Sequence, residues 1–352
     1  SIHGSDISAG DIRTRMAVVS GDGNYCVVND SVAHEQIVFV LNTSMYRFEI
    51  RDRISRDRIS NASTDFGKEP SSLSSDGQRL IVPDANKKLH HVLEYNAGTG
   101  QYEKTGEING SHQSFCSCPP TITPTASHVI IADDTSKSQF VYAYVNGSYA
   151  LLDTLDGSDA GGTIHLGEYS AAVTSNGQRI VVADSGSQSQ LVFMYDTIIQ
   201  PPQYSNHQSI VYSSIPNATV QFGNAKPSLS HDGSILIVAD SGRHSYFVLS
   251  YDTETTQYGY THEIHYKDIP NATSSFGNFP AMLSGNGEIL IVNDTGCHSY
   301  FIFKRTGNEY ILERELYRTL FPRSSLSFAD YPASISTNGD RIVMNEDRLY
   351  IV

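Results

Sequence analysis

Seven acidic residues recur about every 53 positions along the chain, and their carboxylates are the first candidates for chemistry. Each ends a short apolar run and precedes polar residues typical of a turn. Gathered on one face, such carboxylates would attract a cation or a basic ligand. A local role competes with this, because an Asp before small residues caps its own turn through a side-chain hydrogen bond. Repetition explains all the acids at once and favours the capping role. They are Asp30, Asp84, Asp133, Asp184, Asp240, Asp294 and Glu346.

Three histidines each lie four residues after one of these acids and raise the question of a metal site. They are His34, His244 and His298, and the equivalent positions of other repeats hold Lys88, Lys137 and Gln188. A position that accepts His, Lys or Gln is typical of a solvated loop. The pattern therefore disfavours metal binding here.

The cysteines and the known catalytic motifs give no further chemistry. Cys116 and Cys118 form a C-x-C pair without other ligands at zinc spacing, and the pairing of the four cysteines, which include Cys26 and Cys297, cannot be read from the sequence. No nucleophile elbow, P-loop, H-E-x-x-H or Gly-rich dinucleotide turn occurs. The sequence therefore names no catalytic residue, no metal ligand and no cofactor.

The Asn-x-Ser/Thr sequons are stronger evidence for a site than the cysteines are, because several sequons occupy the same position in the repeat. Three of them lie five residues before a Phe-Gly pair or its equivalent, and another lies six before Phe115. Two more fall in expected hairpin turns, whereas Asn29 and Asn293 directly precede a repeat acid at a strand end and are doubtful. Asn is also common in turns for structural reasons. We predict N-glycosylation at Asn61, Asn109, Asn217, Asn271, Asn42 and Asn146.

The elements that must position these residues come from an internal repeat. Two segments that begin at Ile215 and Ile269 are similar in sequence: "IPNATVQFGNAKPSLSHDGSILIVADSG" and "IPNATSSFGNFPAMLSGNGEILIVNDTG". Each unit reads as four short β-branched and aromatic runs separated by turns such as Asp232-Gly233, with no helical period. A period of this length predicts a propeller or another array.

We expect an all-β, seven-bladed β-propeller of four-stranded blades that covers the whole chain. Only two strands fit after Gly339, so residues 2–8 are expected to supply the outer strand of the last blade and close the ring. The expected blades are 11–65, 66–115, 116–165, 166–221, 222–275, 276–327 and 328–352 with 1–10.

Charge and hydropathy limit the possible partners. The net charge of −14 argues against binding the nucleic-acid backbone. No apolar run approaches the roughly 20 residues of a membrane helix. The chain starts at Ser1 rather than Met, which suggests a processed chain or a fragment.

The repeat resembles two propeller families. Literal Phe-Gly pairs at Phe66, Phe222 and Phe276, each followed by an Asp-Gly or Asn-Gly turn and an acid, resemble the FG-GAP repeat of integrin-α-like propellers, which implies extracellular adhesion, recognition or assembly. The calcium loops of that family, D-x-D-x-D-G, are absent, so calcium binding is not carried over. The spacing from Gly67 to Asp84 is also similar to lactonase-type propellers, some of which are hydrolases. The absence of Trp disfavours a WD40 repeat.

The leading expectation is a secreted, N-glycosylated, non-catalytic propeller that binds other extracellular proteins or copies of itself, as in a surface coat or filament. The alternative is a lactonase-like hydrolase with its site at the channel mouth. A stretch free of sequons, Tyr317–Pro332, is expected either to form an interface or to pack the last blade junction. Its candidate residues are Leu320, Phe321, Arg323, Leu326 and Phe328.

Overall fold

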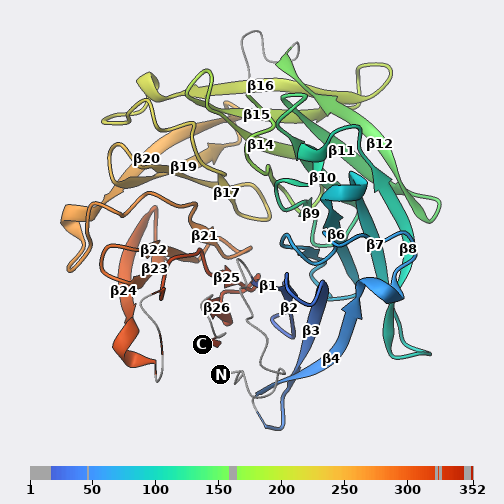
Figure 1. The fold of residues 1–352 in the computed structure, drawn as a ribbon. Helices are drawn as coiled ribbons and strands as arrows, with labels where there is room; N and C mark the ends of the chain where they lie inside the picture. The colour runs from blue at the N-terminus through green and yellow to red at the C-terminus, as the bar shows by residue number, and fades with distance from the viewer. Residues whose placement is uncertain are drawn as a thin grey trace.

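The predicted strands form, and they assemble into antiparallel sheets arranged around a central axis (Figure 1). The computed structural model describes residues 17–45, 47–157, 165–321, 324, 327–344 and 350–351. Within these residues there are six four-stranded blades and one sheet of three strands. No helix of this described part is long and apolar enough to span a bilayer.

Each blade is a meander whose strands pair in chain order. The first two blades consist of β1 (Ala17–Val19), β2 (Tyr25–Asp30), β3 (Glu35–Asn42) and β4 (Arg47–Ser55), then β5 (Ser72–Leu73), β6 (Arg79–Asp84), β7 (Leu89–Asn96) and β8 (Gln101–Asn109). The next two consist of β9 (Thr121–Ile122), β10 (His128–Asp133), β11 (Ser138–Val145) and β12 (Ser148–Leu155), then β13 (Ala172–Val173), β14 (Arg179–Asp184), β15 (Ser189–Asp196) and β16 (Gln203–Val211).

The last two complete blades and the final sheet follow the same order. They consist of β17 (Ser228–Leu229), β18 (Ile235–Asp240), β19 (Ser245–Asp252) and β20 (Gln257–His265), then β21 (Met282–Leu283), β22 (Ile289–Asp294), β23 (Ser299–Thr306) and β24 (Glu309–Tyr317), then β25 (Ser334–Ile335), β26 (Ile342–Met344) and β27 (Tyr350–Ile351). Short 3-10 helices lie at blade ends and turns: Arg56–Arg58, Ala85–Lys87, Gln113–Cys116, Tyr212–Ser214, Tyr266–Asp268 and Arg318–Leu320.

The expected number of seven four-stranded blades is wrong, because the structure has six. The last repeat forms only the three-stranded sheet β25–β27. The expected fourth strand, residues 2–8, lies outside the described residues, so this route of ring closure stays a prediction.

The hydrophobic core lies between neighbouring blades rather than in one central mass. Val38 of the first blade, Leu93 of the second and Phe66 of the connection between them belong to one buried cluster. Corresponding clusters join the later blades. The middle strands are apolar on both faces because each face meets another blade.

A tyrosine near the start of the outer strand ties each complete blade after the first to its own inner hairpin. In the blade of β17–β20, Tyr258 donates its hydroxyl to the carbonyl oxygen of Gly233 at 2.6 Å, and Tyr310 does the same to Gly287 at 2.5 Å. The Tyr258 N–H also donates to the side-chain oxygen of Gln208 in the preceding blade at 2.8 Å. The repeated tyrosine thus connects each turn with its blade and with the neighbouring blade.

Backbone hydrogen bonds link successive hairpin turns around one end of the axis. The amide of His231 donates to Gly285 at 2.8 Å, and that of Asn286 donates to Thr337 at 2.9 Å. The amide of Thr337 then donates to Gly21 at 2.8 Å, which joins the last sheet to the first blade. A Cβ atom at Gly21 would lie only 2.0 Å from the hydroxyl of Ser75. This close approach narrows the space around the central axis at the end where the hairpin turns lie.

Candidate functional site

The repeat acids are buried and cap connections between blades. Asp240 accepts both the N–H and the hydroxyl of Thr219 at 2.6 Å, and Asp294 accepts the same pair of groups from Thr273 at 2.6 Å. Asp30 accepts the amides of Val32 and Ala33 at 2.9 Å. Asp30, Asp84, Asp133, Asp184, Asp240 and Asp294 are at most 5% exposed, and Glu346 lies outside the described residues. Hydrogen bonds within the chain therefore satisfy the described acids, and a ligand-facing role for them stays a prediction.

Two of these acids show how the cap stabilises the charged carboxylate. Burial alone would raise the pKa of Asp84, but hydrogen bonds from His91 and Ser63 outweigh it and lower the pKa. Burial also works to raise the pKa of Asp133, and hydrogen bonds from Ser114 and His112 again lower it. His112 Nδ1 lies 3.0 Å from the Asp133 carboxylate.

The sequons of the connections have a structural role of their own. Asn217 takes a left-handed backbone with φ 65° and donates its amide to Glu263 at 3.1 Å, while the Thr219 of its sequon binds Asp240. Asn61 and Asn271 have the same conformation, and both donate to a glutamate. Exposed or partly exposed side chains also occur at Asn42, Asn109 and Asn146. Glycosylation at these six positions stays a prediction, whereas Asn29 and Asn293 are only 1% exposed.

The histidines that follow the acids share one turn geometry. The left-handed conformation occurs at His34, His244 and His298, and equally at Lys88, Lys137 and Gln188. The His244 ring packs edge-on against Tyr266 with centroids 5.4 Å apart. Among the described residues no group of three His, Cys, Asp or Glu side chains could hold a metal ion, and all four cysteines are free thiols.

The aromatic residues of the predicted interface pack into the last junction. Phe321 stacks on Phe328 at 5.2 Å, and the fully buried Phe328 also meets Tyr300 at 5.3 Å. Leu320 is 48% exposed, whereas Arg323 and Leu326 lie outside the described residues. The two phenylalanines therefore fit the packing role rather than an exposed surface.

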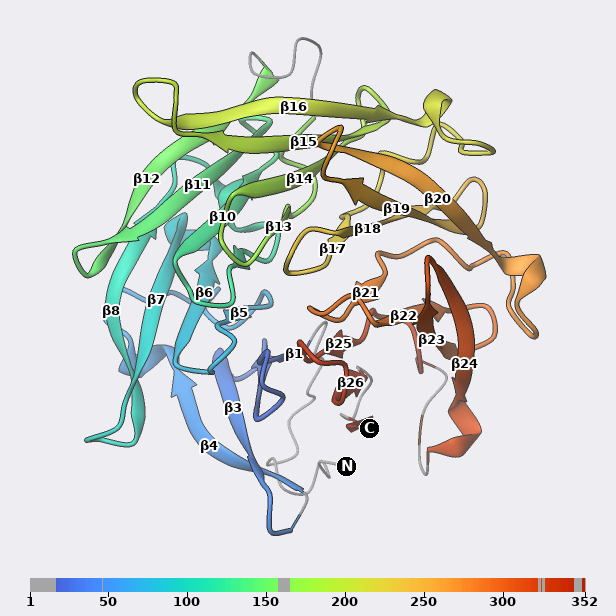
Figure 2. The same ribbon diagram turned by 180° about the vertical axis from the view of Figure 1, so that it is seen from behind.

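The central channel is the cavity that sequence reasoning did not identify. It encloses about 240 Å³ and is lined by the short inner strands and the residues around them. Figure 2 shows the inner strands β1, β5, β17, β21 and β25 around the centre of the ring. Most of its lining is apolar or carries a hydroxyl, including Leu73, Thr121, Ala172 and Met282. Pockets for drug-sized ligands enclose about 300–1,000 Å³, so this channel suits a smaller molecule.

Lys226 is the single charged side chain among the described residues that line the channel. It directly precedes Pro227 and β17, at the end of the channel where the blade connections enter. Its side chain is half-buried, and no hydrogen bond or ion pair to it occurs within the described part of the chain. Burial lowers the pKa of Lys226, and the thiol of Cys118 opposes this effect. A partly buried ammonium without a counter-charge is costly, so this position favours an anionic ligand or loss of the proton.

His231 lines the opposite end of the same channel. It follows β17 by two residues and is separated from Lys226 by about 17 Å of extended chain. Burial lowers the pKa of His231, with a smaller opposing effect of Asp232, and so favours the neutral imidazole. The hydroxyl of Thr337 is buried without a partner at this end. A ligand that touches both ends must lie along the channel axis.

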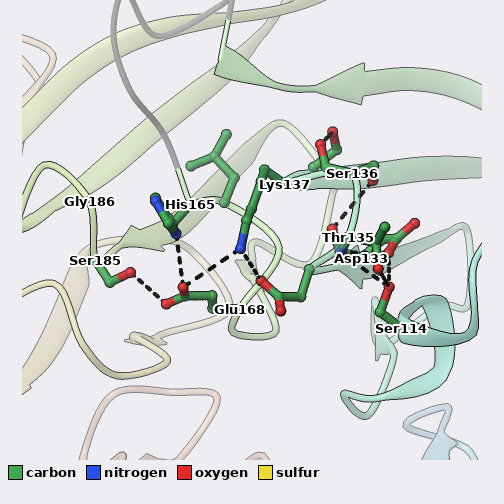
Figure 3. A network of polar contacts seen from close by, with 12 residues as sticks. Ser114, Asp133, Thr135, Ser136, Lys137, His165, Glu168, Ser185 and Gly186 are labelled. Atoms are coloured by element: carbon green, nitrogen blue, oxygen red, sulfur yellow. Dashed lines mark hydrogen bonds and ion pairs between the residues drawn. The ribbon is translucent and has the colours of Figure 1, made fainter.

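Figure 3 shows a polar cluster around Glu168, with His165, Lys137 and Ser185 about its carboxylate. Glu168 lies 3.0 Å from the ring of His165 and 3.9 Å from Lys137, and it accepts the Ser185 hydroxyl at 2.5 Å. The Cys118 thiol donates to the Glu168 backbone carbonyl at 3.3 Å, which places this cluster beside the neighbourhood of Lys226. Because Glu168 already has these partners, it is not a free acid or base.

Comparisons with known proteins show the fold alone. No family model and no curated protein matches the chain. A Bacteroides uniformis protein provisionally named a 6-phosphogluconolactonase is similar at 13% identity and TM-score 0.61 over 86% of this chain and 85% of its own. Kuenenia stuttgartiensis hydrazine synthase is similar at 12% identity and TM-score 0.63 over 100% and 98%. The WD40 repeats of RRP9 are similar at 13% identity and TM-score 0.56 over 97% and 89%.

These findings correct the resemblance to FG-GAP repeats, which is wrong. Similar structures are lactonase-like and WD40 propellers, and the six four-stranded blades differ from the seven of integrin-α-like propellers. The misleading signal was the Phe-Gly pair. Phe66, Phe222 and Phe276 are fully buried between blades, so a propeller of any family can use them for packing.

Lys226 and His231 could have been found by comparing the repeats position by position. Pro280 stands where Lys226 stands in the preceding repeat, and Gly285 stands where His231 stands. A residue type that the other repeats lack is not needed to build the repeat, so it is a candidate for a functional role. The sequence prediction instead singled out the positions that the repeats share, and these are structural.

Proposed function

We propose that the chain is a lactonase-like hydrolase that binds a small anionic lactone in its central channel. The observation that carries this proposal is the Lys226 amine, which has no ion pair or hydrogen bond within the described residues and is the one charged group of the described channel lining. A lactone with a carboxylate or phosphate group would supply the missing negative charge. The provisional name of the similar Bacteroides protein makes lactones the first substrates to test. Secreted adhesion has no corresponding support.

The two titratable groups of the described lining suit different parts of the reaction. In lactone hydrolysis, water adds to the carbonyl carbon, and the ring C–O bond then breaks to give a hydroxy acid. Protonated Lys226 binds the anionic group and fixes the substrate. His231 accepts the proton of the attacking water, because burial favours its neutral, proton-accepting form. The substrate then lies along the channel.

Because the protein as a whole is negatively charged, binding of an anion depends on the positive charge of Lys226. A net charge of −14 repels an anionic substrate at long range, although salt screens this repulsion beyond about 8 Å. Lys226 acts within the channel, where protein excludes much of the screening solvent. The binding free energy therefore depends on this one side chain rather than on steering by the whole surface.

A lactone panel tests the proposal by following acid release with a pH-stat. We expect Lys226→Met to lower kcat/KM about tenfold to a hundredfold, as for loss of a charged hydrogen bond of about 1.5–3 kcal/mol. Lys226→Arg should retain part of the activity, and His231→Asn should lower kcat. Lys304→Met removes an exposed lysine of β23 and is the matched control. No hydrolysis of any anionic lactone by folded protein, or equal rates for Lys226→Met and Lys304→Met, would contradict the proposal.

A further inference from the structure

The position of Lys226 in the repeat shows that the fold does not require a lysine there. Equivalent positions before the inner strands hold mainly prolines, which leave few N–H donors around the channel entrance. In the described repeats these residues are Pro70, Pro119, Ser170, Pro280 and Pro332. Lys226 is the one charged residue among these equivalent positions, and it lines the channel. It therefore points to chemistry at the amine itself.

The surroundings of the amine favour its neutral form when the channel holds no anion. No carboxylate of the described chain pairs with Lys226, and the one side chain whose charge acts against the effect of burial on its pKa is the Cys118 thiol. Burial also raises the pKa of Cys118, so the thiol stays uncharged and gives little compensation. A larger fraction of a desolvated lysine is neutral than of an exposed lysine, and the neutral amine has a free electron pair that can attack a carbonyl group. The channel leaves room for a small molecule beside it.

We propose that Lys226 is a carbonyl-reactive amine that forms an imine with small aldehydes and 2-oxo acids entering the channel. The Nζ electron pair attacks the carbonyl carbon, and the carbonyl oxygen leaves as water with both amine protons. The C=N bond forms without any oxidant or reductant. This activity goes beyond lactone hydrolysis, because it needs neither His231 nor an ester bond. Imine formation uses the neutral amine of Lys226, whereas binding of an anionic lactone uses the protonated amine.

Reductive trapping tests the proposal on the whole folded chain. The protein is incubated with glyoxylate and cyanoborohydride near pH 7.5, and adducts are counted by intact mass and located by peptide mapping. We expect one adduct per chain at Lys226, formed before adducts at any other lysine. Lys226→Met should lose this adduct, whereas Lys304→Met and Cys118→Ser should keep it. Circular dichroism and thermal melting check that each variant is folded.

The outcomes separate this inference from the proposed hydrolase. Adducts that form at equal rates on several exposed lysines, or an unchanged adduct in folded Lys226→Met, would overturn it. Lactone hydrolysis without a Lys226 adduct would leave the hydrolase standing and remove the carbonyl chemistry. A Lys226 adduct without lactone hydrolysis would support the carbonyl chemistry and contradict the proposed hydrolase.

Discussion

At the scale of single residues, the acids and the channel lysine show opposite ways to hold a buried charge. Asp240 is fully buried but accepts hydrogen bonds from two backbone amides and a hydroxyl, so its carboxylate is satisfied. Lys226 borders a cavity and has no such partner in the part of the chain that the structure describes. The first arrangement stabilises the fold. The second leaves a charge for a ligand to meet.

The capped acids predict loss of stability in acid, and Asp84 provides the test. Its pKa is lower in the folded chain than in the unfolded chain. The stabilising effect is therefore complete above the unfolded pKa, near 4, and is lost as pH falls through the folded pKa. We expect Asp84→Asn to be less stable at pH 7 and to show a flatter fall in the free energy of unfolding from pH 5 to 2.

Urea denaturation at several pH values measures this slope. Asp57→Asn is the matched control, because its side chain is 85% exposed and makes only a surface contact with Arg56. This control should follow the parent protein throughout. A slope that is the same in Asp84→Asn and in the parent would show that Asp84 does not contribute to acid unfolding.

At the scale of elements, the connection between blades combines a sequon with a structural turn. Exposed Asn217 precedes Thr219, and the hydroxyl of Thr219 holds Asp240 at the end of β18. The same tripeptide therefore serves as a turn and as a glycosylation signal. Its sequence pattern alone does not distinguish the two uses, since both require Asn and a hydroxyl two residues later.

Burial decides which sequons can carry a glycan. Asn29 and Asn293 donate their amides to backbone carbonyls of Lys68 and Ala329 and are closed to an enzyme in the folded chain. After expression through a eukaryotic secretory pathway, we expect glycans on the exposed connections at Asn61, Asn217 and Asn271. Enzymatic release converts each glycosylated Asn to Asp, which peptide mass mapping detects. Conversion at Asn293, or none at the three connections, would contradict this prediction.

The sequence predicted the elements better than the site. Recurrent Asp-Gly and Asn-Gly turns and β-branched runs fixed the strands, because each repeat must build the same local structure. Even the degenerate third copy, where Ala126 replaces the turn glycine, forms β9–β12. The channel residues could not be found in this way, since Lys226 and His231 are positions where the repeats differ. Which positions face the axis depends on how all the sheets pack together.

At the scale of the whole molecule, the ring closes where the last sheet meets the first blade. The Val19 amide donates to the Ser334 hydroxyl at 3.0 Å, and Val343 belongs to the same buried cluster as Ala17 and Val28. Figure 1 shows β1 beside β25 and β26. This junction joins a complete blade to a sheet of three strands, whereas the other junctions between neighbouring complete blades have four strands on each side.

We expect unfolding to begin at this junction, where a sheet of three strands meets the first blade, rather than between two complete blades. Val343 and Val238 are both fully buried valines of middle strands, one at the junction and one in a complete blade. We expect Val343→Ala and Val238→Ala to lower the free energy of unfolding by similar amounts, about 1–3 kcal/mol. Contacts already broken in the transition state change the unfolding rate most. Val343→Ala should therefore unfold faster in stopped-flow urea jumps, while Val238→Ala unfolds at nearly the parent rate. The reverse order would place the first opening elsewhere in the ring.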